Sequence, residues 1–374
     1  MVTMIYLDSA ATSFLKPPAV QRAMLGAMQH MTSPGRGGHR LAMAAADTVF
    51  RCRSEAAALF GMEDASRVVF TLNATHALNI AIRSVIRPGD PVVISGWEHN
   101  AVTRPLHAMG CKIRVARGNL FDPESVLEAF RKQLPGAKAA VCTHVSNVFG
   151  FVLPIAEIAA LCREAGVPLI VDAAQSAGVL EISQRQLQAA FIAMPGHKGL
   201  LGPQGTGLLL CGDDGEPLMQ GGTGSASREQ AMPETLPDRH EAGTHNVPGI
   251  AGLAAGLEFV TPRRASIRKW EAQLLGQLVA GLRRTEDLEL FYDRTGRSQC
   301  GVLSLRSRTL DCETLSQRLS DRGVAARAGL HCAPLAHESV GTLETGTLRL
   351  SLSPFLTPLE MDAAIGILRN ILNK

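Results

Sequence analysis

The sequence lacks the features that mark several large classes of protein. No run of its 374 residues is apolar for long enough to cross a membrane. The formal net charge of +3 is too small to indicate a nucleic-acid partner. Its eight cysteines contain no C-x-x-C pair, which argues against a zinc site and against a disulfide scaffold. We therefore expect no bound metal, no nucleic acid and no membrane partner.

The N-terminal segment also lacks the signature of an export signal. Residues 1–8 contain no basic stretch and reach an acidic residue, Asp8, early. Together with the scattered cysteines, this favours a reducing, cytoplasmic location. An apolar content of 46% with 19% charged residues is typical of a globular protein with a large core, and the length allows two domains.

Between about residues 67 and 211 the sequence contains short runs rich in Val, Ile and Leu that alternate with helical patterns. Continuous apolar strands separated by helices predict a mostly parallel sheet that is buried on both faces. The seven predicted strands are Val68–Thr71, Val92–Ser95, Lys112–Val115, Ala139–Thr143, Leu169–Asp172, Phe191–Met194 and Gly207–Cys211. The last of them is a candidate antiparallel member.

The character of the chain changes after residue 212. Residues 212–244 are polar and glycine-rich, which predicts irregular segments near a site or an interface. A helical pattern covers 247–284, strand-like runs follow at 301–306, 323–328 and 347–352, and a capping box at Thr357 and Glu360 opens a final helix. We predict a large α/β domain over 15–255 and a smaller α+β domain over 256–374 together with 1–14. The N-terminal strand Ile5–Leu7 would join the smaller domain.

Two polar residues follow neighbouring strands of the predicted sheet. Asp172 ends one buried run, and Lys198 follows the next in Gly196-His197-Lys198. Either motif alone is more often a turn or a helix cap, but ligands gather at the carboxyl ends of strands in α/β sheets. Pyridoxal 5'-phosphate (PLP) needs a lysine for a Schiff base and a carboxylate that keeps the pyridine nitrogen protonated. The pair therefore predicts PLP as the cofactor, with Gln175 facing its phenolic oxygen.

Further polar residues stand where such a cofactor needs them. The segment Phe70–Asn79 reads as strand, turn and helix, and a helix opening at Thr75 would bind phosphate unless Thr75 is only a cap. A second and weaker anion site is Gly221–Ser225. His99 follows a strand and could stack on the ring and shuttle protons, although a lone histidine is more often structural. Asn147 follows the next central strand and could hold a substrate carboxylate or the oxygen of the ring.

Taken together, these segments resemble the class V aminotransferase family of fold-type I PLP enzymes, and within it the cysteine desulfurase and selenocysteine lyase-like branch. The resemblance is carried, in the order of the family and over nearly the whole chain, by Tyr6–Thr12, Val171–Gln175, Gly196–Lys198, Glu241–Thr244 and Arg327–Ala333. It implies the fold-type I PLP-dependent transferase fold, with a mostly parallel seven-stranded sheet in the large domain. It also implies a homodimer with shared sites.

The resemblance implies a role for each candidate site residue. The implied cofactor contacts are Lys198 (Schiff base), Asp172 (pyridine nitrogen), Gln175 (phenolic oxygen), His99 (stacking), Thr75, His197 and, across the dimer interface, Thr244 (phosphate). His76 joins this set at a position where the branch often has a glutamate. The implied substrate-binding residues are Asn147 and Arg349, which look like a carboxylate clamp, and Arg327.

Cys332 decides the chemistry. It lies in a turn containing Gly and His, and the neighbouring Arg327 and His331 are expected to favour its thiolate. The desulfurases of the family use this cysteine to attack the substrate sulfur, which leaves an enzyme persulfide and releases alanine. We therefore predict a desulfurase that converts L-cysteine to L-alanine and supplies an acceptor protein. The alternatives are a selenocysteine lyase or other β-eliminating lyase, an aminotransferase, or a catalytically silent scaffold.

Overall fold

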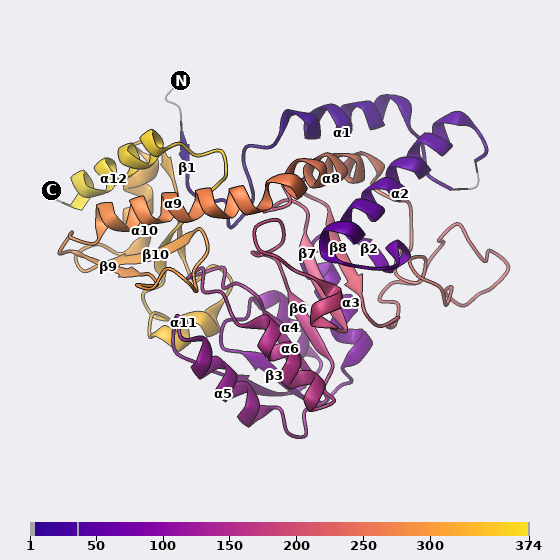
Figure 1. Ribbon diagram of the computed structural model, residues 1–374, viewed down its shortest axis with the longest axis horizontal. Coiled ribbons are helices and arrows are strands. Elements are labelled where there is room, and N and C mark those ends of the chain that lie inside the picture. Colours follow the sequence, from indigo (N-terminus) through magenta and orange to yellow (C-terminus); the bar gives the residue numbers. More distant parts are fainter. Residues whose placement is uncertain (1–3, 36, 373–374) are drawn as a thin grey trace.

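Two large β-sheets and a two-stranded one organise the computed structural model, which describes residues 4–35 and 37–372 (Figure 1). The larger sheet has the seven strands predicted from the sequence, with β8 antiparallel to both of its neighbours and all other pairs parallel. Its spatial order is β2 (Val68–Thr71), β8 (Gly207–Cys211), β7 (Phe191–Pro195), β6 (Leu169–Asp172), β5 (Ala139–Thr143), β3 (Pro91–Ser95) and β4 (Lys112–Ala116). The predicted fold class is confirmed.

Helices cover both faces of this sheet, because alternate residues of a strand point to opposite sides. Val92 and Ile94 of β3 belong to one apolar core, whereas Val93 belongs to the core on the other face. The first core is completed by α3 (Ala74–Val85) and α4 (Asn100–Ala108). The second is completed by α2 (Arg40–Phe60), α5 (Pro123–Gln133), α6 (Ile155–Glu164) and α8 (Val247–Val260), and α1 (Pro18–His30) packs on α8.

The second sheet has four antiparallel strands and its own apolar core. Its order is β12 (Arg327–Gly329), β13 (Thr347–Ser351), β10 (Val302–Ser307) and β9 (Leu288–Phe291). The helices α9 (Arg264–Leu282), α10 (Cys312–Ser320) and α12 (Pro358–Leu372) pack against it. Figure 1 shows α9 running from this sheet towards α8. The predicted domain boundaries at residues 15 and 255 stay predictions.

The N-terminal strand forms a separate two-stranded sheet, and its predicted place in the smaller domain stays a prediction. β1 (Ile5–Tyr6) pairs in parallel with β11 (Val324–Ala325). Of the residues that follow, Ser9 donates through its amide to the Ser351 carbonyl at the end of β13, and Ser13 donates to the His197 carbonyl in the turn after β7. The capping box of α12 is also present, because the Thr357 amide donates to Glu360 Oε2 at 2.8 Å and the Glu360 amide donates to Thr357 Oγ1 at 3.3 Å. Within the described ranges, no helix is both long and apolar enough to span a bilayer.

Some element boundaries differ from those predicted. The strand β9 was not predicted, and the run 323–328 forms two short strands, β11 and β12, in different sheets. The pattern over 247–284 is broken by a 3-10 turn at Thr261–Arg263, because Pro262 lacks the amide that an α-helix requires. The helix α3 begins at Ala74, with Asn73 rather than Thr75 as the N-cap. Residues 212–246 contain neither helix nor strand, as expected for that irregular segment.

The remaining short helices are α7 (Gln184–Leu187), α11 (Pro334–Val340) and the 3-10 turn η1 (Ala65–Arg67). Of these, α11 matters for the site, because the turn that contains Cys332 lies between it and β12.

Candidate active site

The carboxyl ends of β6 and β7 bring Asp172 and Lys198 to the same edge of the large sheet. The two strands are parallel neighbours with Asp172 opposite Ala193, and Lys198 lies in the turn that follows β7. Both residues line a cavity of about 200 Å³, which we call the Lys198 cavity. Five other predicted site residues line it as well: Thr75, His99, Asn147, Gln175 and His197.

Burial shifts the pKa of both Lys198 and Asp172 in the direction that favours the neutral form. Removal from water lowers the pKa of the Lys198 amine to about 8, although the Asp172 carboxylate opposes this shift. Burial raises the pKa of Asp172, against a hydrogen bond from the Ala174 amide to Oδ1 at 2.8 Å and the attraction of Lys198. Because the neutral amine is the nucleophilic form of lysine, Lys198 is more reactive near neutral pH than an exposed lysine.

His99 caps the helix that begins beside the cavity. Its Nδ1 accepts a hydrogen bond from the Ala101 amide at 3.0 Å, and the Asn100 amide donates to the Cys332 carbonyl at 2.7 Å. Burial, reinforced by the charge of Lys198, lowers the pKa of His99 to about 4. The ring is therefore neutral at physiological pH, and since Nδ1 is an acceptor, its proton is on Nε2.

The N-terminal segment forms one wall of the cavity. The Gln175 side chain donates to the Ala10 carbonyl at 3.0 Å, and His197 Nδ1 lies 3.0 Å from Thr12 Oγ1. The Ser13 amide donates to the His197 carbonyl at 2.9 Å, which holds the turn before Lys198. Burial lowers the pKa of His197 to about 4, so this ring is neutral as well.

The opening of α3 supplies the part of the cavity suited to an anion. Asn73 caps the helix by accepting from the His76 amide at 2.9 Å, and Thr75 stands in the first turn, exposed and at the cavity. Amides and the helix dipole give this end partial positive charge. The other anion-site candidate, Gly221–Ser225, lies in the irregular segment after β8 and does not line the cavity.

Two predicted cofactor contacts lie elsewhere. His76 and Thr244 line a separate cavity of about 90 Å³, together with Leu72, Met219 and Glu241. His76 Nδ1 accepts from the Leu72 amide at 3.2 Å, and its Nε2 is buried with no partner in the described parts of the chain. Within one chain, therefore, His76 is not brought to Lys198, contrary to the expectation for a direct contact. We call this second space the Thr244 cavity.

Arg349, which is predicted to hold the substrate carboxylate, binds a carboxylate of the chain itself. Arg349, on β13, is buried, and its Nη1 donates to the Asn147 carbonyl at 3.0 Å while Nη2 donates to Asp8 Oδ1 at 2.8 Å. Arg327, on β12, donates through Nε to Asp8 Oδ2 at 3.0 Å. Asn147 Nδ2 donates to the His331 carbonyl at 2.7 Å, which connects the clamp to the turn before Cys332.

Cys332 differs from the other seven cysteines because it is exposed, whereas they are buried or partly buried. It follows His331 in a turn where both residues have positive φ, +50° and +57°, a conformation that is uncommon outside glycine. Help from His331 for the Cys332 thiolate would require a charged imidazole ring. Burial lowers the pKa of His331 to about 2, and its Nε2 faces the Thr347 carbonyl at 3.1 Å. Arg327 is held by Asp8.

Two buried acids at the site have no individual role predicted from the sequence. Asp8 bridges the two arginines, and Glu98 lies fully buried next to His99, where it accepts from Ser95 Oγ and from the Thr143 amide. Burial raises the pKa of Glu98 to about 8, which favours its neutral form. The only signals in the sequence were an acid directly after a strand and an acid directly before the candidate histidine.

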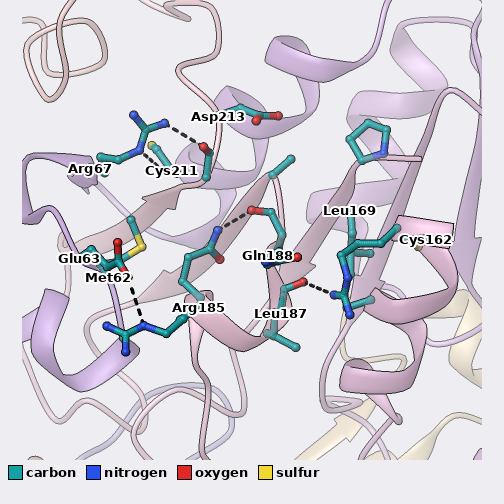
Figure 2. A pocket seen from close by; sticks show the side chains of 18 of the residues that line it. Met62, Glu63, Arg67, Cys162, Leu169, Arg185, Leu187, Gln188, Cys211 and Asp213 are labelled. Atoms are coloured by element: carbon teal, nitrogen blue, oxygen red, sulfur yellow. Dashed lines mark hydrogen bonds and ion pairs between the residues drawn. The ribbon is translucent and has the colours of Figure 1, made fainter. Parts of the chain in front are cut away.

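A larger groove of about 770 Å³ opens at the opposite edge of the sheet, near Leu169, where β6 begins (Figure 2). Its arginines are already engaged, since Arg67 donates to the Cys211 carbonyl, Arg163 donates to the Leu187 carbonyl, and Arg185 pairs with Glu63. We therefore place the site at the Lys198 cavity, despite its smaller volume. Among the residues that the structure describes, no three His, Cys, Asp or Glu side chains group in a way that could hold a metal ion.

Comparison with known proteins identifies the family of the chain. The model of the family described as aminotransferase class-V matches residues 5–363, and the chain belongs to that family. A protein named probable cysteine desulfurase from Methanothermobacter thermautotrophicus is 31% identical, over 96% of this chain and 92% of its own length. One of the same name from Pyrococcus abyssi is 29% identical, over 98% of this chain and 94% of its own length.

Solved structures with the same fold carry similar names. The apo structure of a cysteine desulfurase from Thermococcus onnurineus aligns with a TM-score of 0.92 and 28% identity, over 99% of this chain and 95% of the other. A cysteine desulfurase from Escherichia coli aligns with a TM-score of 0.88 and 26% identity, over the same shares of the two chains. The resemblance described from the sequence is therefore confirmed for the family and for the desulfurase branch.

Proposed function

We propose that this chain is a PLP-dependent cysteine desulfurase, which converts L-cysteine to L-alanine and leaves the sulfur as a persulfide on Cys332. The observation that carries the proposal is the placing of Lys198 and Asp172 on neighbouring strand ends, with the one exposed cysteine tied by its carbonyl to the helix that His99 caps. The names of the relatives support the same activity.

The donor set of the Lys198 cavity fits PLP. Lys198 would hold its aldehyde carbon and Asp172 its pyridine nitrogen, with Gln175 at the phenolic oxygen and His99 against the ring. Thr75, the opening of α3 and His197 would hold the phosphate, because amides at a helix start and neutral donors suit an anion. When bound, PLP supplies an electron sink next to the α-carbon of an amino acid.

The protein side chains would perform the remaining tasks. The guanidinium of Arg349, assisted by Asn147, would orient the substrate carboxylate. The Cys332 thiolate would form a bond to the substrate sulfur as the carbon–sulfur bond breaks, with the electron pair of that bond passing to carbon. That carbon then takes a proton, which gives alanine, and the sulfur stays on Cys332. Lys198, with a pKa near 8, would take up and return protons close to neutral pH.

We further propose a homodimer in which Thr244 contacts the phosphate of the partner's site. Thr244 does not line the Lys198 cavity of its own chain, and the cavity it does line is bordered by the exposed apolar side chains Leu72 and Met219. Exposed apolar residues also lie on α1 and α2, among them Met28 at 70% and Phe50 at 68% exposure. Apolar surface of this kind is typical of a protein interface. Sedimentation tests the proposal, and a fully active monomer would contradict it.

A second candidate function is a selenocysteine lyase or another β-eliminating lyase. It is favoured by the neutral state of His331 and the pairing of Arg327 with Asp8, because neither residue then offers free positive charge beside Cys332. In such an enzyme Cys332 would assist or be a spectator.

We also propose a cytoplasmic location and a protein acceptor for the sulfur, on the basis of the eight unpaired cysteines and the exposed position of Cys332.

The deciding experiment compares the two substrates. Alanine and sulfide released from L-cysteine and from L-selenocysteine should be measured with and without reductant, followed by mass spectrometry of the peptide containing Cys332. For a desulfurase, we expect that peptide to gain one sulfur atom after treatment with L-cysteine. Release of alanine from L-selenocysteine alone, with no added sulfur on Cys332, would replace this function with the lyase.

A further inference from the structure

The Asp8 carboxylate lies between two arginines of very different exposure. Arg349 Nη2 donates to its Oδ1 at 2.8 Å, while Nε and Nη2 of Arg327 both approach its Oδ2 at 3.0 Å. The Arg349 side chain is 3% exposed and the Arg327 side chain is 52% exposed. One oxygen of Asp8 is therefore bound to a buried cation and the other to a cation at the surface.

The donors of Arg349 are only partly used. Nη1 binds the Asn147 carbonyl and Nη2 binds Asp8, but the buried Nε has no hydrogen-bond partner within residues 4–35 and 37–372. Nε and Nη2 lie on the same side of a guanidinium and together bind a carboxylate through two parallel hydrogen bonds. Asp8 therefore occupies half of a two-donor site and leaves a buried donor unsatisfied, which is unfavourable.

We propose that Asp8 is a built-in competitor for the substrate carboxylate and thereby a specificity-determining residue. The inference rests on the proposed function, which supplies an amino-acid substrate. The substrate carboxylate takes both Nε and Nη2 of Arg349, and Asp8 releases Nη2 but keeps its contacts with Arg327. The exchange satisfies the buried Nε donor, and Asp8 retains a cation at the rim of the site.

The same arrangement limits the charge of the substrate. Two arginines and one aspartate leave one positive charge in this cluster, which one carboxylate neutralises. A ligand with a second acidic group would add a negative charge close to Asp8, and like charges at short range repel strongly where water is excluded. Asp8 thus selects for amino acids with uncharged side chains and against those with acidic ones.

The test is the affinity of the holoenzyme for the product-like ligand L-alanine, measured by calorimetry. If Asp8 occupies Arg349 in about nine of ten molecules, the apparent Kd is about tenfold weaker than that of the open site. We therefore expect Asp8→Asn, which keeps an acceptor oxygen but not the charge, to bind L-alanine about tenfold more tightly. The gain should be larger for L-cysteate, which carries a second acid. Arg327→Ala should weaken L-alanine binding, because Asp8 then remains on Arg349.

A matched control is Asp362→Asn, the same change at an exposed position on α12 where the side chain accepts from Gln277. It should bind L-alanine like the wild type. Weaker or unchanged L-alanine binding by folded Asp8→Asn would overturn the inference, because Asp8 would then only position Arg349.

A crystal structure of the wild-type holoenzyme with L-alanine keeps the inference testable if Asp8→Asn does not fold. We expect the ligand carboxylate on Nε and Nη2 of Arg349, with Asp8 Oδ1 beyond hydrogen-bond distance. Bound L-alanine with Asp8 still on Arg349 would refute the inference and leave the proposed function standing. A wild type that binds neither L-alanine nor L-cysteine would overturn both.

Discussion

The two sides of the candidate site are built in opposite ways. Lys198, Asp172 and His99 stand at strand ends of the large sheet, where burial shifts the pKa of each from its ordinary value. Cys332 is exposed in a turn beside the small sheet, and the backbone there has positive φ. Burial suits groups whose pKa must be shifted to fit their task, whereas exposure suits a nucleophile that meets a substrate and then an acceptor.

The largest effect should come from the buried side. We expect Lys198→Ala to lose the visible absorbance of the bound cofactor and to reduce turnover of L-cysteine by at least about 1000-fold, because the variant lacks the amine that binds the aldehyde and moves protons. The absorbance spectrum, and mass spectrometry after borohydride reduction, check this. Lys112→Ala, at an exposed position on β4, should behave like the wild type. A borohydride adduct that persists in Lys198→Ala would contradict the assignment.

Replacement of the exposed Cys332 should have a different effect from replacement of Lys198. We expect Cys332→Ser to bind L-alanine within about twofold of the wild type but to turn over L-cysteine at least about 100-fold more slowly, because a covalent route is lost. Activity on L-selenocysteine should partly survive, since selenol leaves more easily. Turnover assays with both substrates check this, with Cys111→Ser as the partly buried control. L-Cysteine turnover by Cys332→Ser at the wild-type rate would favour the lyase.

Buried groups should also make the stability of the folded chain depend on pH. Burial lowers the pKa of His144, which follows β5, to about 4. The unfolded chain binds this proton near pH 6.5 and the folded chain only near pH 4, so stability falls as the pH decreases through that window. We expect His144 to account for a loss of about 2 kcal/mol in unfolding free energy between pH 7.5 and 5.

Denaturant titrations at the two pH values check this, because His144→Gln should lose less stability than the wild type. The exposed His30→Gln should keep the wild-type slope. Equal pH dependence in His144→Gln and the wild type would show that His144 is not the group that titrates.

The smallest effect concerns α12, far along the chain from the buried site. Thr357→Ala removes the oxygen that accepts the capping hydrogen bond from the Glu360 amide and should lower the free energy of unfolding by about 1 kcal/mol. The cofactor absorbance should not change, because the capping box does not line the Lys198 cavity. Denaturant titration and an absorbance spectrum measure both quantities. An altered spectrum would show that the two sides of the molecule are coupled.

The residues that were predictable from the sequence are those whose positions follow from local pattern. Strand ends are visible as the limits of apolar runs, which is why Asp172 and Lys198 were correctly expected at one sheet edge. The position of His76 relative to Thr75 was not predictable in the same way, because successive helix residues are rotated by about 100° and the two side chains line different cavities of the chain.

The buried acids could not be assigned in this way. Asp8 is buried because it meets Arg327 and Arg349, which lie more than 300 positions further along the chain, and only the tertiary fold brings them together. The neutral state of His331 likewise follows from burial against Thr347 rather than from its neighbours in sequence. Charge at such positions depends on partners that local patterns do not reveal.

The hydrogen bond from the Asn100 amide to the Cys332 carbonyl, 2.7 Å long, limits how far the sulfur can travel. A cysteine on a long loop without such a hydrogen bond could move outward together with the sulfur atom bound to it. Here a hydrogen bond holds the backbone at Cys332 to the start of α4, so that the sulfur can move only by rotation of the short cysteine side chain. On the proposed function, an acceptor protein would have to bind close to this turn and bring its own thiol to Cys332. Transfer of the sulfur would then depend on how the acceptor docks and not on movement of the segment that contains Cys332.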